Sequence, residues 1–173
     1  MILGLHHTAI ATHDIDRLSE FYCSNFAMEK VLDDSWANAE DIDSFIGIKN
    51  SAARFVLLHG GNHCLEIFQY TSPKTGINVL DRPVSDPGYT HICFAVDDIA
   101  SEYARLVASG MLFHAPPTAA GDRPLRATYG RDPDGNVVEL LQITGAHAFN
   151  YKVNTPSWLI LRTDDALARS TLA

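Results

Sequence analysis

The feature that most constrains the fold of this chain is an internal repeat. Each copy opens with a histidine followed by small or apolar residues, at His7 and at His91, and reaches an aspartate seven residues later, at Asp14 and at Asp98. The offsets are 91 − 7 = 84 and 98 − 14 = 84, and the isoleucines that follow the aspartates keep the same register, 99 − 15 = 84. Such self-similarity predicts that one supersecondary unit occurs twice.

Each repeat is predicted to begin with a short strand and to continue with a helix. Apolar residues recur at three- and four-residue spacing after each histidine run, as amphipathic helices require. The residues with this spacing are Ile15, Leu18, Phe21 and Tyr22 in the first copy, and Ile99, Tyr103, Leu106 and Val107 in the second. Asp14 and either Asp97 or Asp98 are the expected N-caps, and Gly110 is a suitable C-terminal stop.

A hairpin is expected at the end of each repeat. In the first copy, strand-like residues 54–59 and 64–70 flank Gly60-Gly61-Asn62. In the second copy, residues 126–131 and 136–143 flank Asp132-Pro133-Asp134-Gly135, in which Pro presets φ and Gly accepts a positive φ. The chain is therefore expected to be α+β, with two tandem βαβββ modules that form a curved mixed sheet.

The predicted organisation is a first module over residues 1–70, a linker over 71–87, a second module over 88–144 and a C-terminal extension over 145–173. Prolines and a glycine mark the linker. The extension holds an apolar run after Trp158 and a possible helix over 164–172, and it either covers an edge, reaches a partner subunit or is a surface appendage. The first copy has a longer middle, and residues 33–53 there are expected to form a substrate-facing loop.

Composition excludes several classes of protein. Of 173 residues, 46% are hydrophobic and 20% are charged, which favours a folded core over disorder. The formal net charge of −8, without a run of Lys and Arg, argues against binding to nucleic acids or anionic membranes. There is no apolar stretch of bilayer-spanning length, and the first residues do not resemble a secretory leader. Three cysteines without a CxxC indicate neither a disulfide framework nor a thiolate zinc site, so a cytoplasmic location is expected.

Four residues occupy matching places in the two modules. Glu66 and Glu139 each lie inside the apolar last strand of a module, where an unpaired carboxylate would be costly. Either Glu alone could equally face outward on a half-exposed strand, but each module also opens with a histidine, His7 or His91. Pseudo-symmetric pairing predicts that two imidazoles and two carboxylates meet at one divalent metal ion, and Ni, Co, Zn, Mn, Mg and Fe(II) all accept such ligands. On an octahedral ion two places would stay open for adjacent substrate oxygens.

Other histidines and the cysteines are assigned lesser roles. His6 is expected on the opposite sheet face from His7, since side chains alternate along a strand. Cys64 and Cys93 lie two residues from Glu66 and His91, so both thiols should share the ligand face as small lining residues, with a soft-metal role as the alternative. The remaining histidines are expected at the surface or in turns: His13, His59, His63, His114 and His147.

The motifs that carry these residues resemble the vicinal-oxygen-chelate superfamily, which includes glyoxalase I, methylmalonyl-CoA epimerase, extradiol dioxygenases and the fosfomycin and bleomycin resistance proteins. The resemblance covers residues 3–144, and its motifs are Leu5-His6-His7, Leu65-Glu66-Ile67, Gly88-Tyr-Thr-His91 and Arg131-Asp-Pro-Asp-Gly-Asn-Val-Val-Glu139. It implies that His7, Glu66, His91 and Glu139 match the metal ligands of glyoxalase I and the epimerase. It also implies a sheet that forms a cup around the metal, and a homodimer, in some members with exchanged modules.

The expected function is that of a metal-dependent lyase or isomerase of glyoxalase or epimerase type. A metal that chelates two vicinal oxygens stabilises an enediolate, and Glu66 or Glu139 could act as the base that moves the proton. One alternative is an Fe(II) extradiol-type dioxygenase that uses His7, His91 and Glu139, which leaves Glu66 without a role. Another is a resistance-type protein that binds a small molecule without catalysis.

The expected substrate is a small molecule. Several large or cationic side chains are candidates to line the cup: Trp36, Phe45, Phe68, Tyr89, Arg123, Arg126 and Tyr129. Of these, Arg123 and Arg126 are the candidates to hold a carboxylate or phosphate.

Overall fold

The structure, a computed structural model, describes residues 4–74 and 82–146. The first half contains β1 (His7–Ala11), α1 (Ile15–Phe26), β2 (Glu29–Ala37), α2 (Glu40–Ile46), β3 (Ala52–Gly60) and β4 (His63–Ser72). The second half contains β5 (Ile92–Ala95), α3 (Ile99–Ala108), β6 (Leu112–Phe113), β7 (Thr118–Ala119), β8 (Leu125–Arg131) and β9 (Val137–Ile143). The predicted pair of βαβββ modules is confirmed, with a short extra helix, α2, in the first.

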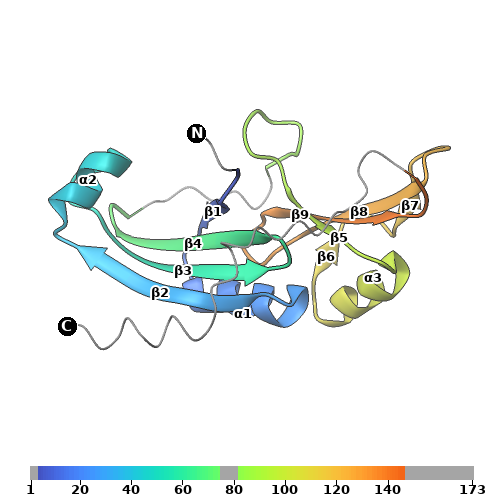
Figure 1. Cartoon of the computed structure of the whole chain (residues 1–173), viewed down its shortest axis with the longest axis horizontal. Coiled ribbons are helices and arrows are strands. Elements are labelled where there is room, and N and C mark those ends of the chain that lie inside the picture. The colour runs from blue at the N-terminus through green and yellow to red at the C-terminus, as the bar shows by residue number, and fades with distance from the viewer. Residues whose placement is uncertain (1–3, 75–81, 147–173) are drawn as a thin grey trace.

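Each half forms its own mixed sheet (Figure 1). The first sheet has the strand order β1-β4-β3-β2, and the second has the order β5-β9-β8-β6, with β7 also paired to β8. In both sheets the first strand of the module runs parallel to the last, whereas the hairpin strands are antiparallel. This topology places the start of each module beside its final strand, so residues far apart in sequence become neighbours.

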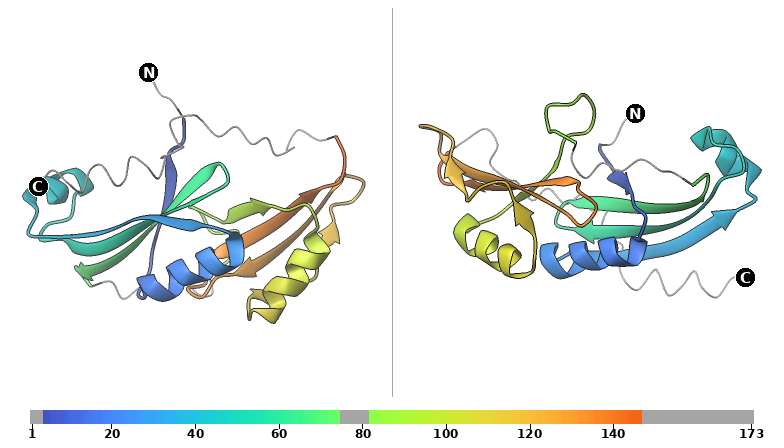
Figure 2. Two further views of the ribbon diagram at one scale, coloured as in Figure 1. Left: turned by 60° about the horizontal axis from the view of Figure 1, so that its bottom comes forward. Right: turned by 180° about the vertical axis from the view of Figure 1, so that it is seen from behind.

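Helices α1 and α3 lie against the same side of the two sheets, and the opposite side of both sheets is left open by them (Figures 1 and 2). Under the first sheet, α1 buries Ile15, Leu18 and Tyr22 against Val56, Leu58, Leu65 and Ile67. Under the second, α3 buries Ile99 and Leu106 against Val138 and Leu140. Because side chains alternate along a strand, the residues between these core positions point to the open side.

The two cores are continuous at the junction between the halves. Phe94 of β5 stacks on Phe26 of α1, with ring centroids 4.2 Å apart, and contributes to both cores. The buried carboxylate of Asp132, in the β8–β9 turn, accepts a hydrogen bond from the Tyr22 hydroxyl at 2.9 Å. In the same turn, Asp134 contacts Arg17 of α1. The halves therefore pack as one body, because α1 of the first half contacts the β8–β9 turn of the second.

Local signals predicted most element ends correctly. Asp14 and Asp98, rather than Asp97, cap the two main helices by accepting hydrogen bonds from main-chain N–H groups. Gly110, at φ +93°, follows the last turn of α3, where the left-handed conformation favours glycine. The prediction that residues 33–53 form a loop is wrong, because they contain the end of β2, all of α2 and the start of β3.

Two other expectations concern the ends of the chain and membranes. The proposed extension over 145–173 lies almost wholly outside the described residues, as do Trp158 and the possible helix over 164–172. In the two described ranges, none of the helices has both the length and the apolar character needed to cross a membrane.

Candidate functional site

The first predicted pair of ligands meets on the open side of the first sheet. Glu66 lies on β4 between the buried core residues Leu65 and Ile67, so alternation turns its carboxylate away from α1. His7 starts the parallel neighbour β1, in register with Cys64, two residues before Glu66. The His7 Nε2 and Glu66 Oε2 atoms are 3.2 Å apart, and the Glu66 side chain is 16% exposed.

The second pair repeats this geometry in the second sheet. His91 directly precedes β5, and Glu139 lies on β9 between the buried residues Val138 and Leu140. Strand β5 runs parallel to β9 with Cys93 opposite Glu139. The His91 Nε2 and Glu139 Oε2 atoms are 2.9 Å apart, and the Glu139 side chain is 13% exposed. The predicted symmetry of the two pairs is thus present in the fold.

The surroundings of the two glutamates differ. Cys93 of β5 and Tyr129 of β8 are the cross-strand neighbours of Glu139. Partial desolvation, with a smaller contribution from the charge of Glu139, raises the pKa of the Cys93 thiol to about 12 and also raises the pKa of Tyr129. The Tyr129 ring packs edge-on against His91, with centroids 5.3 Å apart. Glu66, by contrast, has only His7 as a hydrogen-bond or ion-pair partner within the described ranges.

Each pair offers an imidazole nitrogen and a carboxylate oxygen, a donor combination that suits borderline divalent ions. A single chain nevertheless brings the four residues together as two separate pairs: in the described ranges there is no group of three or more His, Cys, Asp or Glu side chains able to hold a metal ion. The donor chemistry therefore fits a divalent metal, but each half of one chain supplies only half of the expected ligand set. Cys64 and Cys93 share the ligand face, as predicted, without completing such a group.

Aromatic residues continue the open face of the first sheet beyond Glu66. Phe68 and Tyr70 follow Glu66 at two-residue steps on β4, and Phe55 of β3 stacks on Phe68 at 5.7 Å. Trp36 of β2 contacts all three rings, with centroids 5.8–5.9 Å apart. We call these four residues the aromatic wall; none is fully buried, so the wall presents an apolar surface beside the first ligand pair.

A short hydrogen-bonded chain holds Trp36 in place. Its Nε1 donates to the hydroxyl of Ser51 at 2.8 Å, and Ser51 is 1% exposed. The Asp43 carboxylate in turn accepts hydrogen bonds from the Ser51 hydroxyl and main-chain N–H, and from the Asn50 N–H. These bonds keep the pKa of Asp43 below its usual range. Helix α2, which stands where a loop was expected, thus positions Trp36, the outermost ring of the aromatic wall.

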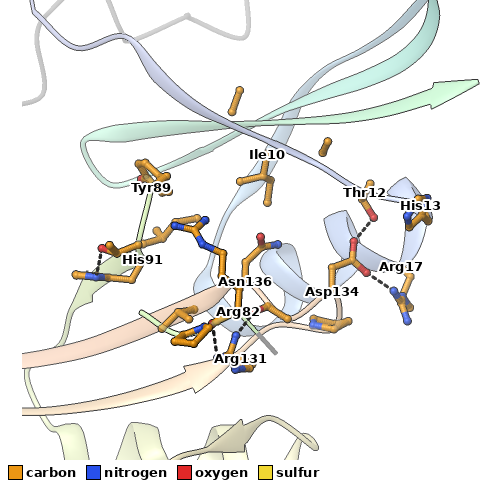
Figure 3. A pocket seen from close by; sticks show the side chains of 18 of the residues that line it. Ile10, Thr12, His13, Arg17, Arg82, Tyr89, His91, Arg131, Asp134 and Asn136 are labelled. Carbon is orange, nitrogen blue, oxygen red and sulfur yellow. Dashed lines mark hydrogen bonds and ion pairs between the residues drawn. The ribbon is translucent and has the colours of Figure 1, made fainter. Parts of the chain in front are cut away.

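A crevice of about 630 Å³ lies between β1, the residues leading into β5 and the β8–β9 turn (Figure 3). His91 and Tyr70 line it, so it adjoins both the second ligand pair and the aromatic wall. Tyr89 also lines it, and its hydroxyl is 3.5 Å from the Thr8 hydroxyl. Three arginines line the same crevice: Arg17, Arg82 and Arg131.

Some predicted lining residues lie elsewhere. Arg126 and Tyr129 lie three residues apart on β8, so their side chains are on opposite faces of the sheet, and Arg126 is on the helix side. It donates a hydrogen bond to the Pro117 carbonyl and does not line the open face. Arg123 is exposed in the turn before β8, and Phe45 is 77% exposed on α2. Sequence reasoning missed Phe55, Tyr70, Arg82 and Arg131; the two-residue step from Glu66 was a signal for Tyr70.

The expectations for the other histidines were partly wrong. His59 and His63 lie in β3 and β4 rather than at the surface or in a turn, and His59 Nε2 is buried without a hydrogen-bond partner in the described residues. Burial, with smaller effects of His7 and His6, lowers the pKa of His63. His6 contacts His7 edge-on just before β1. His147 lies outside the described residues.

Comparisons with known proteins agree with this fold. Residues 4–140 match the family described as the Glyoxalase/Bleomycin resistance protein/Dioxygenase superfamily. The chain is similar to a lactoylglutathione lyase of Schizosaccharomyces pombe, with 29% identity over 147 residues, which is 79% of this chain and 46% of that protein. It is also similar to a 4-hydroxyphenylpyruvate dioxygenase-like protein of Rattus norvegicus, with 30% identity over 116 residues, which is 62% of this chain and 31% of that protein.

The chain thus spans from about a third to about half of these curated relatives. Among solved structures, a glyoxalase family protein from Bacillus cereus has the same fold, with a TM-score of 0.74 and 19% identity, covering 84% of this chain and 97% of that one.

Proposed function

The chain belongs to the Glyoxalase/Bleomycin resistance protein/Dioxygenase superfamily, and within it we propose that this protein is a metal-dependent lyase or isomerase of glyoxalase or epimerase type. The observation that carries the proposal is the repeated His–Glu pair. Each module places an imidazole Nε2 within 3.2 Å or less of a carboxylate Oε2 on its open face. A non-catalytic binding cup would have no need of two partly buried carboxylates, which are costly to desolvate.

We further propose that the site is completed between two copies of the chain. His7 and Glu66 of one copy would join His91 and Glu139 of the other, which explains why a single chain shows pairs rather than a set of four. A homodimer would then hold two equivalent sites, since a two-fold axis brings each half of one chain to the other half of its partner.

When bound, a divalent ion would act as a Lewis acid on two vicinal substrate oxygens. The protein's own carboxylates would then move the proton between neighbouring atoms of the substrate. Glu66 is our candidate for this base, because His7 is its only hydrogen-bond or ion-pair partner in the described residues, whereas Glu139 is flanked by Cys93 and Tyr129 on the neighbouring strands. The aromatic wall would exclude water beside Glu66 and contact the carbon part of the substrate.

A second candidate function is that of an Fe(II) extradiol-type dioxygenase, and the similarity to a 4-hydroxyphenylpyruvate dioxygenase-like protein favours dioxygenase chemistry of this general kind. Its two-histidine, one-carboxylate site would use His7, His91 and Glu139 and would not need Glu66. The repeated pair favours the first candidate, because it gives Glu66 the same place as Glu139.

The test is metal content by elemental analysis of gently purified protein, before and after re-metallation, with an aerobic catechol assay. We expect a stoichiometric divalent ion without oxygen uptake, and loss of metal in His7→Ala and Glu66→Gln. His114→Ala is the matched control, because His114 is exposed directly after β6, and this variant should keep its metal. Iron(II) with oxygen consumption that survives Glu66→Gln would establish the dioxygenase instead. Absence of metal, even after re-metallation, would leave a small-molecule-binding protein.

Subunit mixing tests where the site is assembled. One variant carries His7→Ala and Glu66→Gln, and the other carries His91→Ala and Glu139→Gln, so neither holds a complete ligand set alone. If sites form between copies, mixed dimers regain one intact site, and metal binding returns when the two variants are unfolded and refolded together. If sites form within one chain, mixing restores nothing.

A further inference from the structure

The crevice between the two sheets carries an unusual charge for this acidic chain (Figure 3). Its charged lining residues are three arginines and one aspartate, Asp134, which gives a formal charge of 3 − 1 = +2 with histidines neutral. The whole chain has a net charge of −8. A positive concavity on an otherwise acidic protein concentrates field lines and attracts anions.

Two of the arginines are not neutralised by carboxylates in the described residues. Arg17 contacts Asp134, but within the described residues Arg82 donates only to the main-chain carbonyls of Asp86 and Pro87. In the same part of the chain Arg131 donates only to main-chain carbonyls, those of Gly135 and of Arg82. The second of these bonds ties the Arg131 side chain to the segment that carries Arg82.

These bonds hold both guanidinium groups while leaving donors free. A guanidinium has five N–H donors in a planar fork. Each of the two arginines uses two donors on carbonyls, so three of the five on each have no partner among the residues that the structure describes. Because main-chain hydrogen bonds already hold both guanidinium groups in place, binding of an oxyanion would cost little further side-chain conformational entropy.

We propose that this crevice binds an oxyanion, a carboxylate or a phosphate, carried by a small molecule. Its volume, about 630 Å³, lies within the range of small-molecule sites, roughly 300–1,000 Å³. Since His91 lines the crevice, the anion would lie beside the second ligand pair, and its natural source is an anionic group of the substrate. That last step rests on the proposed function; the anion site itself does not.

The first experiment measures the anion site without metal. Inorganic phosphate is titrated by calorimetry, at low ionic strength, into EDTA-treated protein that has been dialysed. We expect saturable binding that Arg131→Gln and Arg82→Gln each weaken by about tenfold or more, as loss of a charge-assisted hydrogen bond predicts.

Arg126→Gln is the matched control, because Arg126 also lies on β8 and donates to a carbonyl but faces the helix side. It should leave phosphate binding unchanged. Circular dichroism verifies that each variant is folded, and Arg82, which precedes β5 in a connecting segment, provides the second variant if Arg131→Gln unfolds. Absence of saturable binding, or an equal loss in Arg126→Gln, would overturn the proposal.

The second experiment identifies the source of the anion in metal-loaded protein. Succinohydroxamate and butyrohydroxamate chelate metals through the same two oxygens, but only the first carries a carboxylate. Tighter binding of succinohydroxamate that Arg131→Gln abolishes would assign the crevice to the substrate's own anionic group. Equal binding of the two, with phosphate binding intact, would overturn that assignment and indicate a free anion. If the metal site does not exist, neither hydroxamate binds, but the phosphate titration still shows whether the crevice binds an anion.

Discussion

The contact between Tyr22 and Asp132 joins the two halves of the chain, and its removal is a direct test of that junction. Tyr22 is fully buried on α1, and its hydroxyl donates to the carboxylate of Asp132, which is 5% exposed, at 2.9 Å. Asp132 keeps three other donors from its own turn: the Asn136 side chain and the N–H groups of Asp134 and Asn136. Burial raises the pKa of Asp132 despite these bonds.

Tyr22→Phe deletes one hydrogen bond to a buried carboxylate without leaving a large cavity. Such bonds contribute about 1.5–3 kcal/mol, and because three donors remain we expect a loss of about 2 kcal/mol in the free energy of unfolding. For a chain of this length each kcal/mol lowers Tm by roughly 2–4 °C, so the expected decrease is about 4–8 °C. Urea unfolding followed by circular dichroism should show a lower midpoint with an unchanged slope.

Tyr103→Phe is the control, because the Tyr103 ring packs on Phe113 and its hydroxyl has no hydrogen-bond partner in the described ranges. It should change the free energy of unfolding by less than about 0.5 kcal/mol. If Tyr22→Phe were no more destabilising than this control, the Tyr22–Asp132 bond would not hold the halves together, and apolar packing alone would join them.

Three further predictions concern other groups. In metal-free protein, Glu139→Gln should lower the pKa of Cys93, which now stands at about 12, and speed its alkylation by iodoacetamide at pH 8 by about tenfold per pKa unit, as measured by peptide mapping. Ser51→Ala should cost about 1–2 kcal/mol and shift the fluorescence of Trp36, read with Trp158 replaced by Phe, since the part-buried Trp36 N–H loses its acceptor. Asp33 has a pKa held well below its usual 3.8 by hydrogen bonds from Arg54 and then Lys30. Its contribution to stability is therefore present above pH 3.8 and lost as pH falls below this value. Asp33→Asn should make Tm decrease less steeply at acid pH, and an unchanged decrease of Tm at acid pH would contradict this.

The sequence by itself determined the features that depend on local periodicity. The repeat of His7 at His91, the two capped helices and the Asp132–Gly135 turn follow from spacing and turn chemistry, and the structure has them where they were predicted. The face on which Glu66 lies was also predictable, because side chains alternate strictly along a strand. These signals failed within residues 33–53, where a strand and a short helix without a strong apolar period were taken for a loop.

Only the tertiary structure decided which groups from distant segments meet. It separated the four predicted ligands into two pairs, and it brought Arg82 to Arg131 through a main-chain hydrogen bond. It also placed Trp36 in the aromatic wall through Ser51. The physical reason is that such contacts depend on how sheet edges and turns from the two halves pack against each other. Local sequence periodicity specifies the face of each strand, but it does not specify the position of that strand relative to the other sheet.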